Sequence, residues 1–172
     1  FYDFTWDGNS YHKSTIGFLI DGWNPLYETM KEFDDLAEDT LNINESSYLW
    51  GEHYAQFSHF FAANIGIVTG NIESGKSINI MSIYVLFAFV LCLLFKKYPQ
   101  NYSFNILFSL SLITCSTIGT QFLTNYVDIL VYIYLFLLIL TFFYFEFDRD
   151  TKNENELLLI YFLTLIALIN IK

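Results

Sequence analysis

Four long runs of apolar, almost uncharged residues occupy the second half of the sequence, and they constrain it more than any other feature. The runs cover about residues 78–95, 103–123, 129–145 and 157–172. The first has eighteen residues without a charge, which meets the length that a helix needs to cross a bilayer. A helix also satisfies its backbone hydrogen bonds internally, as lipid requires. We therefore expect an all-α integral membrane protein with about four transmembrane helices.

The two ends of the chain affect how its length is interpreted. The sequence begins at Phe1 rather than Met, and it stops at Lys172 within the fourth apolar run. That run is short for a span, because about 20 residues are needed to cross the hydrocarbon core. We expect the chain to be a piece of a longer protein, truncated at both ends.

Charge divides the sequence into two parts. Residues 1–77 hold twelve acidic side chains against three lysines, a net charge of −9, whereas residues 78–172 carry only −1. We expect a polar segment at 1–77 and a membrane region at 78–172. The total charge of −10 argues against nucleic acid as a partner, since phosphate binding needs clustered Lys and Arg.

Basic residues between the apolar runs indicate the orientation. Lys96 and Lys97 follow the first run, and Arg149 and Lys152 follow the third, two crossings later. The positive-inside rule places both loops in the cytoplasm. Residues 1–77 then face the opposite side, which we expect to be the periplasmic face of a bacterial inner membrane.

The exoplasmic segment is rich in aromatic residues and predicts two short helices along the membrane surface. The first covers about residues 10–20 and ends at Gly22. Residues 30–41 form an acidic, solvated stretch, and residues 47–68 form the second helical stretch, closed by Gly70. Trp and Tyr favour the headgroup level of a membrane, which suits both helices.

Residues 70–77, Gly-Asn-Ile-Glu-Ser-Gly-Lys-Ser, satisfy the pattern of a phosphate-binding P-loop. We expect no ATP here, because the following helix is a membrane span and the loop faces away from the cytosol. The alternative is structural. Asn71 caps the long helix, Glu73 suits its positive end, and Lys76 neutralises Glu73 at i+3.

Carboxylates lie among aromatic residues near the start of the chain, notably Asp3 and Asp7. A partly desolvated carboxylate is a better base for a hydroxyl group, because loss of water raises its proton affinity. The plainer interpretation is that Asp7 caps the helix that begins near Ser10.

Asp7 stands four residues before Tyr11, and the helix that follows ends in Gly22-Trp23. This pattern resembles the first exoplasmic loop of the C-type (GT-C) superfamily of membrane glycosyltransferases, which includes lipid A aminoarabinose transferases and protein mannosyltransferases. Gly8 stands where many members have Glu. The stretch 54–79 and the turn 121–128 are similar to parts of uncharacterised bacterial members.

The resemblance implies an inverting transferase that takes a sugar from a polyprenyl-phosphate donor and passes it to a lipid, glycan or protein acceptor. In that scheme Asp7 is the general base, and Asp3 is the runner-up. Tyr11 belongs to the substrate site, and three further residues are candidates to meet the lipid phosphate: His12, His53 and Lys76.

A divalent metal ion such as Mg²⁺ or Mn²⁺ is used by some members, and Asp128 is the candidate ligand here. A solvated turn explains Asp128 equally well, because a hard cation wants several oxygen ligands.

The alternative from another class is a non-enzymatic membrane protein, such as a glycan flippase or a transporter subunit. Those proteins place ionisable groups within their spans. The runs 78–95, 103–123 and 129–145 contain none, which favours the enzyme.

Overall fold

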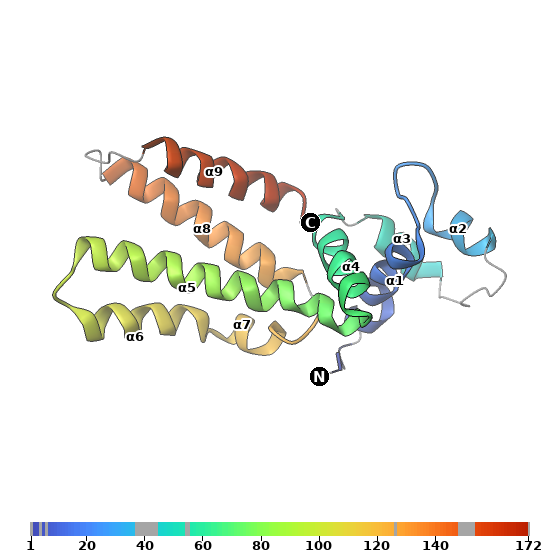
Figure 1. The fold of residues 1–172 in the computed structure, drawn as a ribbon, viewed down its shortest axis with the longest axis horizontal. Helices are drawn as coiled ribbons and strands as arrows, with labels where there is room; N and C mark the ends of the chain where they lie inside the picture. Colours follow the sequence, from blue (N-terminus) through green and yellow to red (C-terminus); the bar gives the residue numbers. More distant parts are fainter. Residues whose placement is uncertain are drawn as a thin grey trace. The chain divides into compact units, whose positions relative to one another are not determined.

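The computed structural model describes residues 2–3, 5, 7–36, 45–53, 56–125, 127–147 and 154–171, and over these residues the chain is all-helical (Figure 1). The chain divides into two compact units. The first comprises residues 1–78, 123–127 and 170–172, and the second comprises 79–122 and 128–169. The basic loop residues Arg149 and Lys152 and the turn residue Tyr126 lie outside the described residues.

The first unit is built from short helices. They are the π-helical turn η1 (Gly8–His12), α1 (Lys13–Asp21), α2 (Met30–Leu36), α3 (Glu45–His53), α4 (Phe57–Thr69) and the 3-10 helix η2 (Ile72–Lys76). Helix α1 packs on α4, and α4 packs on η2. The buried core consists of apolar side chains from α1, α2 and α4 with the turn after α1: Ile16, Phe18, Leu19, Trp23, Met30, Ala62 and Ala63.

Two glycines end helices where the sequence predicts it. Gly22 follows α1 with φ 105°, and Gly70 follows α4 with φ 69°. Glycine adopts this left-handed conformation without the steric cost that a Cβ brings. The amide of Trp23 then donates to the carbonyl of Phe18 at 2.8 Å, which closes the end of α1.

The prediction of an acidic, solvated stretch over residues 30–41 is wrong at its start. Helix α2 forms there, and it buries Met30 and Asp34. The Tyr48 hydroxyl donates to Asp34 Oδ2 at 2.6 Å, so one carboxylate of the stretch is held by α3. Residues 47–68 also differ from the prediction, because they divide between α3 and α4. The segment therefore holds more than two short helices.

The second unit contains the apolar runs. Its helices are α5 (Ser77–Lys97), whose first two residues belong to the first unit, α6 (Tyr102–Ile113), α7 (Ser116–Gln121), α8 (Asp128–Phe147) and α9 (Glu154–Ile169). Helices α8 and α9 pack side by side (Figure 1). The run 103–123 is not one continuous helix, because Cys115 has an extended backbone with ψ 156° between α6 and α7.

Among the described residues, one helix is both long and apolar enough to cross a membrane. It covers residues 72–97, with η2 leading directly into α5. The other apolar helices, at 57–69, 102–113, 128–144 and 157–169, are shorter. At 1.5 Å per residue, α6 is about 18 Å long, well below a hydrocarbon thickness of about 30 Å.

We predict that Gly75→Ala destabilises the first unit by about 1–3 kcal/mol, the usual cost of overpacking. A Cβ at Gly75 would lie 2.8 Å from Ala62 Cβ and 3.2 Å from the Ala62 carbonyl oxygen, so α4 and η2 would have to separate. The measurement is the shift in the thermal unfolding midpoint.

The control for this variant is Gly17→Ala, in α1 of the same unit. Its Cβ would meet Ile72 Cδ1 at 3.8 Å, an ordinary contact, and Ala is a better helix former than Gly by about 1 kcal/mol. An unchanged midpoint for Gly75→Ala would contradict the close packing of α4 on η2.

Candidate functional site

A cluster of three charges joins α1 to η2 in the first unit. Lys13 Nζ donates to Glu73 Oε1, and Lys76 Nζ lies 2.7 Å from Glu73 Oε2. The side chains of Glu73 and Lys76 are 9% and 6% exposed, so this carboxylate is largely removed from water. Burial of a charge is costly unless it is paired, and here two ammonium groups flank one carboxylate.

The pairing also sets the protonation state of Glu73. Burial by itself raises the pKa of a carboxyl group. The hydrogen bonds and charges of Lys13 and Lys76 outweigh burial and hold the pKa of Glu73 below its usual range. Glu73 is therefore ionised at neutral pH.

Asp3 is buried beside this cluster. Its Oδ1 accepts from the Thr5 amide at 2.9 Å and from the Thr5 hydroxyl at 2.6 Å. Its Oδ2 accepts from the Asn125 amide at 2.6 Å and from Asn125 Nδ2 at 3.2 Å. The Asp3 amide donates to Glu73 Oε2 at 3.3 Å, which links the carboxylate site to the charge cluster.

Gly8 lies directly against Asp3. A Cβ on Gly8 would lie 2.2 Å from Asp3 Oδ2 and 2.3 Å from Thr5 Oγ1. The Asp3 carboxylate therefore fills the space that a side chain at position 8 would need. This contact gives a physical reason why glycine stands at position 8.

Asp7 is half-buried at the start of η1. It is the first residue of the helical segment, but its side chain makes no capping hydrogen bond. Among the residues that the structure describes, no hydrogen bond or ion pair holds the Asp7 carboxylate. Side-chain capping therefore does not account for this residue.

His12 and His59 form a buried pair in the same unit. His12 Nδ1 lies 2.9 Å from His59 Nε2, and both residues are 1% exposed. His59 Nδ1 lies 3.1 Å from Gln56 Oε1, a carbonyl oxygen that can only accept. His59 therefore carries its proton on Nδ1, and His12 Nδ1–H donates to His59 Nε2. Burial, with a smaller contribution from His12, lowers the pKa of His59 to about 3, so this ring is neutral at physiological pH.

The other predicted substrate-binding residues have different surroundings. Tyr11 is buried, with its ring 4.3 Å from that of His12 and 6.4 Å from that of Trp50, centroid to centroid. His53 is exposed at the end of α3, and its Nδ1 lies 3.0 Å from the Leu49 carbonyl oxygen. Lys76 is buried in the charge cluster.

The P-loop-like string forms a capped 3-10 helix. Asn71 Oδ1 accepts from the Glu73 amide at 3.0 Å, and the Ser74 amide donates to the Asn71 carbonyl at 3.0 Å. Lys76 pairs with Glu73 at i+3. The structural interpretation of Asn71 as a cap and of Lys76 as the partner of Glu73 is confirmed.

Asp128, the candidate metal ligand, begins α8 in the second unit. Over the described ranges, no group of three or more His, Cys, Asp or Glu side chains is arranged to hold a metal ion. The structure therefore adds no further ligand to Asp128.

Comparison with known protein families, with curated proteins and with solved structures gives no match for this chain.

Sequence reasoning missed four members of the site: Lys13, His59, Thr5 and Asn125. The sequence did contain a signal for His59, because residues 59, 62, 63 and 66 recur at the spacing of one helix face. The structure buries all four residues. The partners Lys13 and Asn125 lie 60 and 122 residues from Glu73 and Asp3, respectively, so no local pattern indicates them.

We predict that Glu73→Gln destabilises the first unit by about 3 kcal/mol at neutral pH, because it removes the carboxylate from a buried charge cluster. The depressed pKa of Glu73 means that its contribution is fully present above the ordinary value of 4.5. The contribution is lost as the pH falls through the native pKa. The difference in unfolding free energy between wild type and variant should therefore shrink in acid.

The matched control is Glu45→Gln. Glu45 also pairs with a lysine, Lys31, but at 3.8 Å and with its side chain 92% exposed, so its loss should cost less than about 1 kcal/mol. Equal effects of the two substitutions, or a pH-independent effect at Glu73, would contradict this account of the cluster.

Proposed function

We propose that this chain is part of a membrane glycosyltransferase of the C-type superfamily. It transfers a sugar from a polyprenyl-phosphate donor to a lipid, glycan or protein acceptor at the outer surface of a bacterial inner membrane. Asp7 is the general base. The observation that carries the proposal is the Asp7 carboxylate, which is half-buried at the start of η1 and held by no hydrogen bond within the described residues.

The chemistry follows from that carboxylate. Asp7 takes the proton of the acceptor hydroxyl as its oxygen forms a bond to the anomeric carbon of the sugar. The bond from this carbon to the phosphate oxygen breaks on the opposite face, and polyprenyl phosphate leaves, so the configuration inverts. A base already saturated with hydrogen bonds has no lone pair available for this proton.

Asp3 suits the role of general base less well than Asp7. It is 4% exposed, and its carboxylate accepts four hydrogen bonds from Thr5 and Asn125. Those donors occupy its oxygens. We propose that Asp3 is a positioning residue, which holds the segment before η1 in place through its contacts with Thr5 and Gly8.

His53 is the most accessible candidate to meet the donor phosphate. Lys76 already pairs with Glu73, and His12 Nδ1 is directed at His59. His53 is exposed, and its Nδ1–H donates to the Leu49 carbonyl, which leaves Nε2 at the open edge of the ring. A protonated His53 would donate from Nε2 to a phosphate oxygen.

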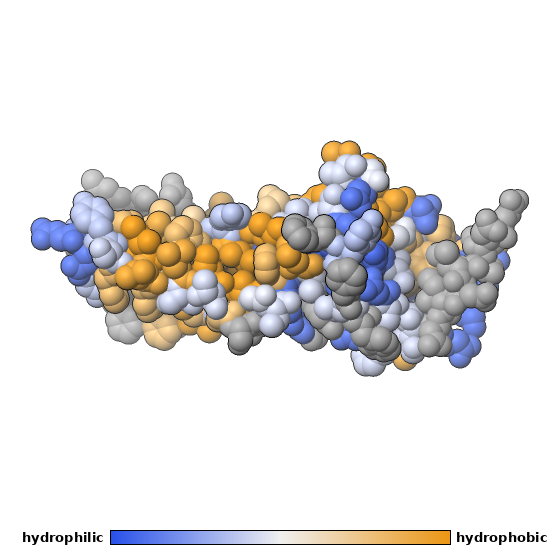
Figure 2. Space-filling model, turned by 90° about the horizontal axis from the view of Figure 1, so that it is seen from below, coloured by the Kyte–Doolittle hydropathy of each residue, from blue (hydrophilic) through white to orange (hydrophobic). Residues whose placement is uncertain are grey.

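Membrane insertion of the second unit is supported by its surface. Figure 2 shows hydrophobic residues gathered over these helices. Eight large side chains there, mostly apolar, are more than half exposed, and exposed apolar surface of this kind marks an interaction site or a membrane-facing surface: Met81, Tyr84, Val85, Phe104, Leu107, Phe143, Leu159 and Leu163. Lys96 and Lys97 at the end of α5 fit a cytoplasmic loop.

We predict that Asp7→Asn in the full-length protein lowers sugar transfer by about 10²–10⁴-fold, the usual contribution of a general base. The measurement is the transfer of labelled sugar from a polyprenyl-phosphate donor to acceptor in membranes that contain equal amounts of each variant.

Asp21→Asn is the matched control, because it removes an exposed carboxylate at the other end of the same helical segment. Asp3→Asn tests the positioning role and should lower protein stability together with activity. Transfer at the wild-type rate by Asp7→Asn would overturn the assignment of Asp7 as the base.

A further inference from the structure

Helix α4 exposes its large apolar residues and buries its small and polar ones. Five apolar side chains recur at the spacing of one helix face and are 40% to 86% exposed, and we call them the α4 face: Phe57, Phe60, Phe61, Ile67 and Val68. The opposite side of the helix is buried: Ser58, His59, Ala62, Ala63 and Gly66. A surface helix of a soluble protein has the reverse arrangement, with its polar side outside. The α4 face therefore suits an apolar surrounding rather than water.

Charge is absent from this part of the sequence. Residues 54–72 contain no Asp, Glu, Lys or Arg. At 1.5 Å per residue, the α4 face is about 16 Å long from Phe57 to Val68. Its insertion into the outer part of a leaflet would remove no charged side chain from water.

The polar side chains on the exposed side of α4 are turned to their own backbone. Asn64 Nδ2 donates to the Phe60 carbonyl oxygen at 2.7 Å, and the Thr69 hydroxyl donates to the Ile65 carbonyl oxygen at 2.8 Å. Donors with acceptors inside the helix are what a surrounding without water requires. A protein partner usually meets a polar rim that forms hydrogen bonds across the interface. Lipid therefore fits the α4 face better than a protein surface does.

Helix α4 lies beside the start of the proposed membrane span. It packs on η2, which leads directly into α5 within the helix 72–97 that is long and apolar enough to cross a bilayer. A Cβ at Gly75 of η2 would lie 2.8 Å from Ala62 Cβ, so the small-residue side of α4 meets η2 closely. Small residues permit such close approach between helices in membranes. Helix α4 is therefore at the outer end of the span, where the bilayer begins.

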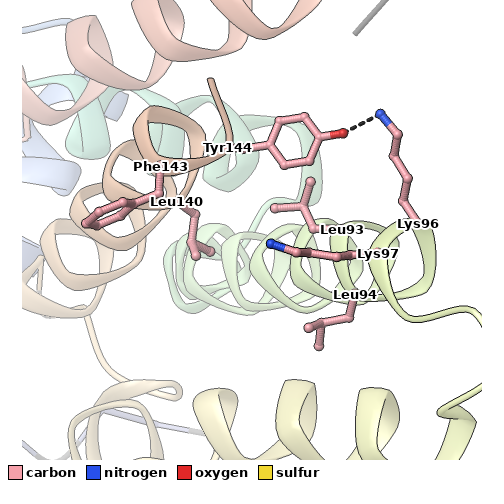
Figure 3. Close-up of a pocket in the computed structure, with 7 residues that line it drawn as sticks. All are labelled: Leu93, Leu94, Lys96, Lys97, Leu140, Phe143 and Tyr144. Carbon is pink, nitrogen blue, oxygen red and sulfur yellow. Dashed lines mark hydrogen bonds between the residues drawn. The ribbon is translucent and has the colours of Figure 1, made fainter. Parts of the chain in front are cut away.

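The other end of the span has a different composition. In the second unit, α5 and α8 line a groove whose apolar residues include Leu93, Leu140 and Phe143 and whose polar residues include Lys96 and Tyr144 (Figure 3). Lysine and tyrosine beside apolar side chains are typical of the headgroup level. The α4 face contains neither residue type, and Phe, Ile and Val prefer hydrocarbon. The α4 face thus suits acyl chains rather than headgroups.

We propose that the α4 face lies among the acyl chains of the outer leaflet and anchors the first unit to the bilayer. Helices of this kind bury their apolar side about 5–10 Å into the boundary between headgroups and acyl chains. This inference rests on the membrane insertion proposed for the second unit. It goes beyond that proposal, because it gives the unit that bears Asp7 a lipid-facing surface of its own.

Spin labels on the α4 face test this inference. Phe61→Cys and Val68→Cys, each in a Cys92→Ser, Cys115→Ser background of the full chain, accept a nitroxide at an exposed position. In vesicles of phosphatidylethanolamine and phosphatidylglycerol, we expect both labels to collide more often with oxygen, which concentrates in lipid, than with a water-soluble nickel chelate. Power-saturation electron paramagnetic resonance measures both collision rates.

The matched control is Lys31→Cys on α2 of the same unit. The Lys31 side chain is 59% exposed and lies among acidic residues, so its label should collide more often with the nickel chelate than with oxygen. The same preference for the nickel chelate at positions 61 and 68 would overturn the inference. Labels at these positions that neither reagent reaches would also contradict it, because a protein segment or a second copy would then cover the face.

Leu107→Cys separates this inference from the proposed function. Leu107 is 66% exposed on α6 of the second unit, for which membrane insertion is proposed. A label in lipid at position 107, with those at 61 and 68 in water, would remove the α4 anchor alone. A label in water at position 107 would remove the membrane insertion on which both proposals rest.

Discussion

The carboxylate of Glu73, buried between Lys13 and Lys76, connects the parts of the first unit that lie far apart in sequence. One carboxylate oxygen accepts a hydrogen bond from Lys13 of α1. The other pairs with Lys76 at the end of η2 and accepts from the Asp3 amide. A buried carboxylate with a single partner would cost more in lost hydration than the pair returns. The second ammonium group adds a further attraction, and these contacts connect α1, η2 and the segment before η1.

A second long-range contact, between Asp3 and Asn125, also depends on a buried carboxylate. Asp3 accepts from the backbone and side chain of Asn125, which brings residues 123–127 into the first unit. Gly8 allows this close approach, since any larger side chain would occupy the place of the Asp3 carboxylate. Asp3 and Glu73 therefore use their oxygens to hold the unit together, whereas no hydrogen bond within the described residues engages the Asp7 carboxylate.

Local patterns in the sequence predicted the local features of the structure. Helix ends at Gly22 and Gly70, the cap at Asn71 and the pair between Glu73 and Lys76 all depend on neighbours within a few residues. Helix α2 was missed, because its stability comes from burying Met30 and from the Tyr48–Asp34 hydrogen bond rather than from an apolar stripe. The break at Cys115 was also missed, since an uncharged run shows composition but not where backbone hydrogen bonds are interrupted. Contacts such as Asp3 with Asn125 depend on tertiary packing.

The central claim is that the unit bearing Asp7 lies on the outer side of the membrane and that the end of α5 lies in the cytoplasm. Single cysteines at Thr29→Cys and Gln100→Cys, in a Cys92→Ser, Cys115→Ser background, test it by labelling with a membrane-impermeant maleimide. Both native residues are exposed, in the first unit and in the turn after α5. We expect labelling of Thr29→Cys in intact cells and of Gln100→Cys only after the membrane is opened. Labelling of Gln100→Cys in intact cells, or protection of Thr29→Cys, would contradict the account.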